Sequence, residues 1–279
     1  MTLPRQFFFR SARLLAIASC CIAGALSLPA AAQTPEAIQQ KGTLTVGVQA
    51  EFPPWGSIDQ AGNNVGYDID VAKVVAADLG VKLQFVPVTA GNRVAYLTTG
   101  KVDMLIAAVG MYPDRAKAVQ FSKPYATLDG VVYAKKSANI RSWTDLAGLQ
   151  VGAARGSAAD VAMTKDAPPT AKLLRFEDDA APIQALLSEQ VDAIGSTNLV
   201  ALVLARSPAG SKFEQKFSFT RQYNGIATRL DQPAINAWLN ACLDRNLANG
   251  KLDAINVKWT GAKLPAFPSE LPGVPFEAK

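Results

Sequence analysis

Strand-like and helix-like segments alternate along this chain, and that alternation constrains its fold more than any other feature. The predicted elements, in chain order, are strand 44–48, helix 69–79, strand 81–85, helix 93–99 and strand 103–109. Apolar residues recur at every second position in the first strands and at helical spacing in the helices. The first helix is expected to have its N-cap at Asp68 and to end at Gly80. This order predicts a parallel sheet flanked by helices.

The same order recurs in the second half of the chain. Leu44-Thr45-Val46-Gly47 has a counterpart in Leu149-Gln150-Val151-Gly152. Residues 96–103, which end in Val102-Asp103, have one in residues 185–192, which end in Val191-Asp192. These echoes predict two similarly built α/β lobes. Two lobes enclose a cleft, and clefts at domain junctions are preferred ligand sites.

The C-terminal third completes the first lobe. A strand at Tyr223–Ala227 is expected to return to it, followed by helices over 233–248 and 252–259. The proline-rich tail is expected to be extended or poorly ordered. The predicted organisation is a leader (1–32), lobe 1 (33–132), lobe 2 (133–222), the return part of lobe 1 (223–263) and the tail (264–279).

The first 32 residues are typical of a secretory signal peptide. Arg5, Arg10 and Arg13 precede an apolar run from Leu14 to Leu28, and Ala30-Ala31-Ala32 supplies the small residues of a cleavage site before Gln33. The run is too short and too rich in alanine and serine to predict a membrane span. In an alternative interpretation, Ile17-Ala18-Ser19-Cys20 is a lipobox and Cys20 is acylated. Both interpretations place the product outside the cytoplasm, in the periplasm.

Charge and residue usage exclude several classes of function. Without the three leader arginines, 25 Lys and Arg face 23 Asp and Glu, a net charge of +2, which does not indicate nucleic-acid binding. The chain has no histidine, which removes Ser-His and Cys-His nucleophilic sites and the common zinc sites. Cys242 is the only thiol beyond the leader and lies in an apolar helical stretch, as a buried structural cysteine does. No cofactor is predicted.

From Leu44 to Gly261 the chain resembles the periplasmic amino-acid-binding proteins of ABC importers, solute-binding protein family 3. The matching segments are Val46–Val48, Phe52–Trp55, Val65–Ala72, Thr99–Asp103, Pro113–Lys117, Phe121–Tyr125, Asp145–Gly152 and Gln190–Ala193. The resemblance implies the α/β, two-lobed type II periplasmic-binding-protein fold, with two mixed sheets flanked by helices and a cleft between the lobes. It also implies binding of a small carboxylate-bearing ligand, an amino acid or a derivative.

The resemblance places the ligand's α-carboxylate on Arg115, in the segment Pro113-Asp114-Arg115. A planar guanidinium offers two parallel charged hydrogen bonds to a carboxylate, which lysine does not reproduce. The alternative is a solvated arginine near the start of a helix.

On the second lobe, Gly156-Ser157-Ala158 lies where the family has a turn that opens a helix. Backbone N–H groups at such a turn suit an anion. Ser157 either donates its hydroxyl to the ligand or caps the helix. Ala158 stands where many relatives have a second hydroxyl, so only its N–H group can contribute.

Three further residues are candidates for the pocket wall. The resemblance implies an aromatic side chain over the ligand on the loop of Phe52 and Trp55, and we expect Phe52 in the pocket and Trp55 in the core or at the rim. Asn92-Arg93 resembles a segment of relatives that bind acidic amino acids, in which the arginine faces the distal group of the ligand. Arg93 is alternatively an exposed residue of a first helical turn.

Three positions depart from the family's pattern. Thr197 stands where relatives have the aspartate that accepts the ligand's ammonium group, Gln49 replaces another pocket aspartate, and Gly110 replaces a supporting hydroxyl. A buried ammonium without a carboxylate partner is costly. The ligand is therefore an atypical amino acid, a derivative with a masked amine or a carboxylate without an amine, unless backbone carbonyls near Ala108 and Gly110 accept the ammonium.

The expected mechanism is hinge closure about two strands, near Val131–Ala134 and Gln222–Ile226, followed by docking of a monomer on an ABC permease of the inner membrane. One alternative is an exported enzyme on the same fold, similar to cyclohexadienyl dehydratases. Such an enzyme needs a general acid or base, for which Glu51 is the nearby candidate. Another alternative is a sensory protein that reports its ligand to a receptor.

Overall fold

The structure, a computed structural model, describes residues 33–277, so the expected leader, its cleavage site and Cys20 lie outside the described residues. The helices are α1 (Pro35–Lys41), α2 (Tyr67–Leu79), α3 (Arg93–Thr98), α4 (Pro113–Ala116), α5 (Ala158–Asp166), α6 (Ala180–Leu187), α7 (Val200–Leu204), α8 (Pro233–Ala248) and α9 (Lys251–Thr260), with 3-10 turns η1 (Trp143–Leu146) and η2 (Pro208–Lys212). The strands are β1 (Thr43–Val48), β2 (Ser57–Ile58), β3 (Asn64–Val65), β4 (Lys82–Pro87), β5 (Met104–Leu105), β6 (Gln120–Lys135), β7 (Gln150–Ala154), β8 (Lys172–Phe176), β9 (Ala193–Thr197) and β10 (Phe213–Thr228).

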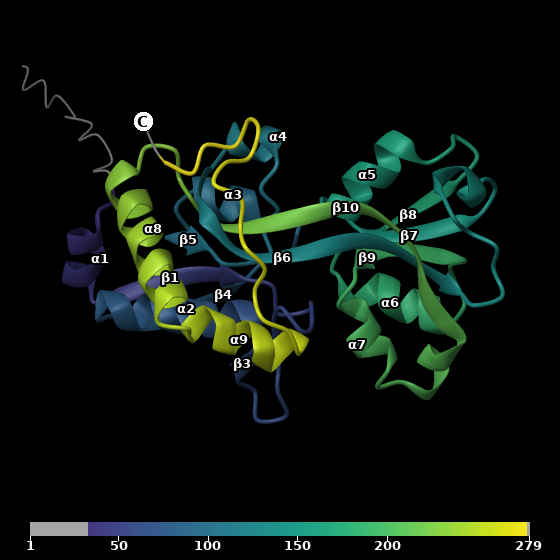
Figure 1. Cartoon of the computed structure of the whole chain (residues 1–279), viewed down its shortest axis with the longest axis horizontal. Coiled ribbons are helices and arrows are strands. Elements are labelled where there is room, and N and C mark those ends of the chain that lie inside the picture. Colours follow the sequence, from purple (N-terminus) through teal and green to yellow (C-terminus); the bar gives the residue numbers. More distant parts are fainter. Residues whose placement is uncertain (1–32, 278–279) are drawn as a thin grey trace, which may run out of the picture. The chain divides into compact units, whose positions relative to one another are not determined.

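One eight-stranded sheet, in the order β4-β1-β5-β10-β6-β9-β7-β8, runs through both lobes. In the first lobe β1 pairs in parallel with β4 and β5, and in the second lobe β7 pairs in parallel with β8 and β9. The strands β6 and β10, each of 16 residues, lie side by side in an antiparallel pair between these two sets (Figure 1). The two expected sheets are therefore joined into one, because β6 and β10 are hydrogen-bonded along both lobes.

Each lobe has its own apolar core, formed by two clusters of buried residues. In the first lobe one cluster gathers residues of β1, α2 and α8, including Leu44, Ile69 and Leu239, and the other includes Leu97 and Phe121. The two clusters of the second lobe are centred on side chains from β6, β7, α5 and α6. Two separate cores allow the lobes to move as units about the strands that join them.

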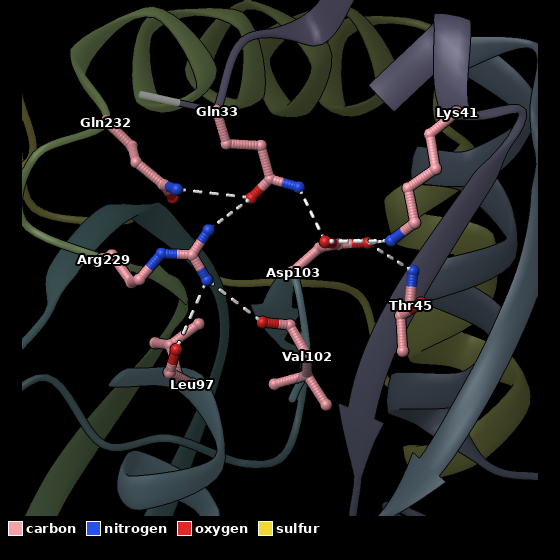
Figure 2. A network of polar contacts seen from close by, with 8 residues as sticks. All are labelled: Gln33, Lys41, Thr45, Leu97, Val102, Asp103, Arg229 and Gln232. Carbon is pink, nitrogen blue, oxygen red and sulfur yellow. Dashed lines mark hydrogen bonds and ion pairs between the residues drawn. The ribbon is translucent and has the colours of Figure 1, made fainter. Parts of the chain in front are cut away.

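The sequence repeat corresponds to a repeated structural device. Asp103 accepts a hydrogen bond from the N–H of Thr45 at 2.8 Å, and its own N–H donates to the Thr45 carbonyl. Asp192 makes the same reciprocal pair with Gln150 in the second lobe. In the first lobe Asp103 also contacts the Gln33 amide and the Lys41 ammonium (Figure 2). Each aspartate thus fixes the start of the first strand of its lobe.

The repeat extends to one backbone conformation. Gly100 precedes Asp103 by three residues and has φ +74°, in the left-handed region. Its counterpart is Glu189, with φ +58°. A side chain in this region is disfavoured by the contact between Cβ and the following carbonyl group. Glu189 of the second lobe therefore adopts the left-handed backbone conformation that glycine adopts at the equivalent position of the first lobe.

Two local expectations are corrected. The N-cap of α2 is Gly66, and Asp68 is a buried carboxylate within the first turn, because its side chain points into the lobe instead of back to the helix. The tail is extended but fixed on the first lobe: Val274 and Phe276 are buried, and Asn240 donates to the Phe276 carbonyl at 2.9 Å. Apolar side chains among the prolines hold this tail in place.

We predict that Gly100→Ala lowers the free energy of unfolding by about 1 kcal/mol, since no atom lies within 4 Å of the added Cβ and only backbone strain changes. At the equivalent position Glu189→Gly should be more stable than Glu189→Ala, in which the left-handed strain remains. Thermal unfolding measures both, and about 1 kcal/mol corresponds to a shift of roughly 2–4 °C at this size. Equal melting temperatures for the two variants at position 189 would contradict the structural equivalence.

Candidate functional site

A pocket lies between the lobes, where the carboxyl ends of their parallel strands face each other. Gln49 follows β1, Arg93 follows β4 and Ala108 follows β5 in the first lobe; Ser157 follows β7 and Asp179 follows β8 in the second. Ligand sites of parallel α/β sheets occupy this end of the strands. The lining residues are Gln49, Phe52, Ala90, Arg93, Ala108, Leu128, Gly130, Ser157, Ala158, Ala159, Asp179, Ser196, Thr197 and Gln222.

The pocket is closed in this structure. The cavity between its lining residues has a volume of only about 30 Å³. Loops of the two lobes touch nearby: a Cβ built on Gly156 would lie 3.1 Å from the Cα atom of Gly91. An amino acid can enter only if the lobes separate.

Arg93 is a buried cation of the pocket, with 3% of its surface exposed, so the alternative of an exposed helix residue is wrong. The loop before it is held by reciprocal bonds between Thr89 and Asn92, which place Arg93 at the start of α3 facing the pocket. Its Nη1 donates to the Ala107 carbonyl at 2.6 Å and to Gln49 Oε1 at 3.0 Å. Burial and the nearby charge of Arg115 lower the pKa of Arg93.

Gln49 links the charges of the two lobes. Its Oε1 accepts from Arg93 and its Nε2 donates to Asp179 Oδ2 at 2.5 Å. Asp179 is 6% exposed, and burial raises the pKa of its carboxyl group to about 6 although Arg93 and Gln49 act in the opposite direction. A neutral amide between a cation and a carboxylate serves both, which an aspartate at position 49 would not do next to Asp179.

The turn that opens α5 offers two free backbone donors. The N–H of Gly156 donates to Asp160 and that of Ser157 to the Ala154 carbonyl, so both are used. The N–H groups of Ala158 and Ala159 lie in the first helical turn and have no backbone acceptor in the described part of the chain. Ser157 caps the helix by accepting from Asp160 N–H at 3.1 Å, and it also lines the pocket.

Arg115 lies where the first lobe meets this turn. Its guanidinium donates to the carbonyl groups of Gly110 at 3.2 Å and Gly156 at 3.1 Å, one from each lobe. The guanidinium carbon lies 5.1 Å from the centre of the Tyr112 ring. Within residues 33–277 no carboxylate forms an ion pair with Arg115, and burial lowers its pKa. The arginine is not part of the wall of the closed pocket itself.

The turn after β5 is strained and held by a buried acid. Ala108 has φ +47°, which is uncommon for a residue with a Cβ. Its N–H donates to Asp68 Oδ2 at 2.7 Å, and Tyr125 donates its hydroxyl to Asp68 Oδ1 at 2.7 Å. Burial raises the pKa of Asp68 to about 7. This acid fixes the turn whose carbonyl groups face Arg93 and the pocket.

The structure gives a physical reason for glycine at position 110. A Cβ on Gly110 would lie 2.6 Å from Gln222 Cδ, because the Gln222 side chain fills the space beside it. Gln222 accepts from the Tyr112 hydroxyl at 3.0 Å and lines the pocket from β10. Its amide therefore occupies the space that a side chain at position 110 would need.

The remaining candidates divide between pocket and core. Phe52 lines the pocket, and Thr197 does so at the end of β9. Trp55 is 1% exposed and packs on Tyr67, with ring centres 5.1 Å apart, so it belongs to the core. Sequence reasoning missed Asp179 and Gln222. The Asp178-Asp179 pair before α6 was a usable signal, since one aspartate is enough to cap a helix.

We predict that the unliganded protein becomes more stable as the pH falls from 8 to about 5. Asp68 and Asp179 have pKa values of about 7 and 6, above the value of 3.8 for an unperturbed aspartate, so the folded state takes up protons before the unfolded state does. Denaturant unfolding at several pH values measures this. Asp179→Asn should flatten the profile between about pH 4 and 6; a parent protein that loses stability steadily from pH 8 to 5 would contradict the argument.

The described residues contain no cluster of metal-binding side chains, and none of their helices is both long and apolar enough to cross a bilayer. The site thus consists of backbone donors, two arginines, one aspartate and amide side chains around a small closed pocket.

Residues 44–262 match the model of the bacterial extracellular solute-binding proteins, family 3. The ABC transporter glutamine-binding protein GlnH of Bacillus subtilis is 31% identical over 231 residues, which are 81% of this chain and 84% of that protein. An ancestral arginine-binding protein bound to arginine superimposes with a TM-score of 0.75 at 34% identity, covering 79% of this chain and 99% of the other. The ancestral amino acid-binding protein AncCDT-1, a precursor of cyclohexadienyl dehydratase, does so with a TM-score of 0.76 at 32% identity, covering 81% and 99%. The chain belongs to the bacterial extracellular solute-binding proteins, family 3.

Proposed function

We propose that this chain is the extracytoplasmic solute-binding subunit of an ABC importer and that it captures a small amino acid or derivative by its carboxylate. The observation that carries the proposal is Arg115, a cation between the lobes without an acidic partner in the described residues. The free N–H groups of Ala158 and Ala159 lie at the start of α5. Gly156, in the turn just before the Ser157 N-cap of this helix, accepts a hydrogen bond from the Arg115 guanidinium through its carbonyl group. A carboxylate held there would receive charged and backbone hydrogen bonds together.

The names of similar proteins support an amino-acid ligand. GlnH is named for glutamine, and the ancestral structure contains arginine. These amino acids share an α-carboxylate and an α-ammonium group and differ at the far end of the side chain. In this chain the pocket wall includes the cation Arg93, whose pKa is lowered by burial and by the nearby charge of Arg115. A ligand with a cationic side chain is therefore disfavoured, and an anionic or hydrogen-bond-accepting side chain is favoured.

Capture proceeds by closure of the lobes about β6 and β10, which join lobe 1 (33–132 and 223–263) to lobe 2 (133–222) in our proposal. The pair has register shifts, among them one between Ser218 and Thr220, and such irregular positions bend more easily than a regular ladder. The contacts Gln49–Asp179 and Arg115–Gly156 exist only when the lobes are together. A ligand that adds contacts to both lobes shifts the equilibrium toward the closed form.

The permease and the export route complete the proposal. A monomeric, closed binding protein would present both lobes to an inner-membrane permease. The protein reaches this location through a signal peptide at residues 1–32, which the sequence pattern predicts, or is anchored there through Cys20.

A second candidate function is an enzyme similar to the dehydratases that descend from AncCDT-1. The observation that favours it is Asp179, a pocket carboxylate with a pKa of about 6, which suits general acid or base catalysis. Glu51, the candidate from the sequence, is exposed. We favour binding because the matching family model and the relatives named above are solute-binding and amino-acid-binding proteins. Incubation with cyclohexadienyl carboxylates, the class of substrate that the enzyme's name indicates, followed by mass spectrometry, separates the two functions. A product formed by the parent and not by Asp179→Asn would establish the enzyme.

We predict that Arg115→Ala weakens amino-acid binding by about 100-fold or more, because two charged hydrogen bonds to the carboxylate are lost. Isothermal titration of the parent and variant with the tightest-binding amino acid of a thermal-shift screen measures the change. Arg206→Ala, which removes the same charge from an exposed position outside the pocket, is the matched control and should bind like the parent. If Arg115→Ala binds as tightly as the parent, the carboxylate is held elsewhere.

A further inference from the structure

Asp179 occupies the N-cap position of α6, but its side chain makes no capping hydrogen bond to that helix. The neighbouring Asp178 accepts the N–H groups of Ala180 and Ala181 at 2.9 and 2.8 Å through one carboxylate oxygen. The Asp179 side chain makes no capping bond and instead crosses to the first lobe, where Oδ2 accepts from Gln49. The two adjacent aspartates thus have different roles: Asp178 caps the start of α6, and Asp179 faces the pocket.

Asp179 is the only acidic residue that lines the pocket in the described part of the chain. The polar groups at the end of β9, Ser196 and Thr197, are neutral hydroxyls. Arg93 does not neutralise Asp179 by direct contact: no ion pair within 4.0 Å joins them, and the Gln49 amide lies between. Only Oδ2 of Asp179 accepts a side-chain hydrogen bond from residues 33–277, so Oδ1 has capacity for a further donor.

An amino acid brings an ammonium group into this pocket with its carboxylate. Burying that group without an anionic acceptor is costly. A neutral hydroxyl or carbonyl group provides a hydrogen bond but not the opposite charge. With Arg115 beside the carboxylate, the ligand's ammonium needs a negative group on the other side, and the second lobe provides one at position 179 instead of 197.

We propose that Asp179 accepts the ammonium group of the ligand in the closed form, so that this site selects α-amino acids with a free amine over N-acylated or amine-free carboxylates. The proposal rests on the proposed function, because it takes an amino acid bound by its carboxylate at Arg115. It replaces the expectation of an atypical or amine-free ligand, which followed from the departures at Thr197, Gln49 and Gly110.

The test is a thermodynamic cycle between the protein carboxylate and the ligand amine. The probes are the twenty standard L-amino acids and L-cystine, each beside the acid with hydrogen in place of its ammonium group, such as glutaramate for L-glutamine and glutarate for L-glutamate. Affinities are measured by isothermal titration for the parent, Asp179→Asn and Asp178→Asn. The last variant removes the same charge one residue away and keeps a good capping residue, so it is the matched control.

For the parent and Asp178→Asn, the best amino acid should bind about 100-fold more tightly than its amine-free counterpart. In Asp179→Asn this ratio should fall to a few-fold, because the amine has lost its charged acceptor. An unchanged ratio in Asp179→Asn would overturn the inference and leave the proposed function intact. So would a parent protein that binds both compounds equally, a result that does not depend on the folding of any variant.

Failure of the proposed function has a different signature. If neither the amino acids nor their amine-free counterparts bind to the parent protein, both proposals are wrong. If amino acids bind and Arg115→Ala has no effect, the carboxylate site is misassigned, while the cycle at Asp179 still reports the ammonium site. Thermal unfolding of each variant checks the fold, and Asp179→Asn should melt no lower than the parent because it relieves a buried charge.

Discussion

The antiparallel pairing of β6 and β10 is the interaction on which the rest of the molecule depends. In the described part of the chain, β10 pairs with β5 of the first lobe and β6 pairs with β9 of the second lobe. The pairing of β6 with β10 therefore joins the two halves of the main sheet. The residues of the pocket lie on β6, β9 and β10, or on the loops and helix starts that follow the other strands of the same sheet. Because each lobe has its own core, the pair fixes direction and register while it permits relative movement.

The pocket and the residues around it contain buried charged groups of both signs. Arg93 and Arg115 are close enough to affect each other electrostatically, and Asp68 and Asp179 are carboxyl groups whose pKa values burial has raised. Each of these groups is disfavoured by its own desolvation. In our proposal, a ligand with separated positive and negative groups supplies partners for Asp179 and Arg115.

Sequence reasoning predicted most of the architecture because the determining signals are local and repeated. The helix over 233–248 follows directly from apolar periodicity, and the Asp103 and Asp192 echoes proved to be the same hydrogen-bonded device. The two lobes were indicated by the internal sequence echoes, whereas the type II fold and the role of Arg115 came from the family resemblance. Neither route found Asp179 or Gln222, because their roles depend on which side chain fills space across the cleft. Asp68 was misread as a cap for the same reason: its partners Ala108 and Tyr125 lie about 40 and 57 residues away.

The course of the chain through β6 and β10 also has a consequence for the order in which the protein is built. The second lobe is formed by one continuous stretch between these strands, from η1 to η2. The first lobe is interrupted by that stretch, and its core includes Ile235 and Leu239 of α8. During synthesis the chain emerges with its N-terminus first. The second lobe can therefore fold as soon as its continuous stretch has been made, whereas the first lobe can fold completely only after α8 and α9 have been made. Until then the apolar faces of β1 and α2 lack the cover of α8, so this half of the molecule exposes apolar surface for longer than the other half does.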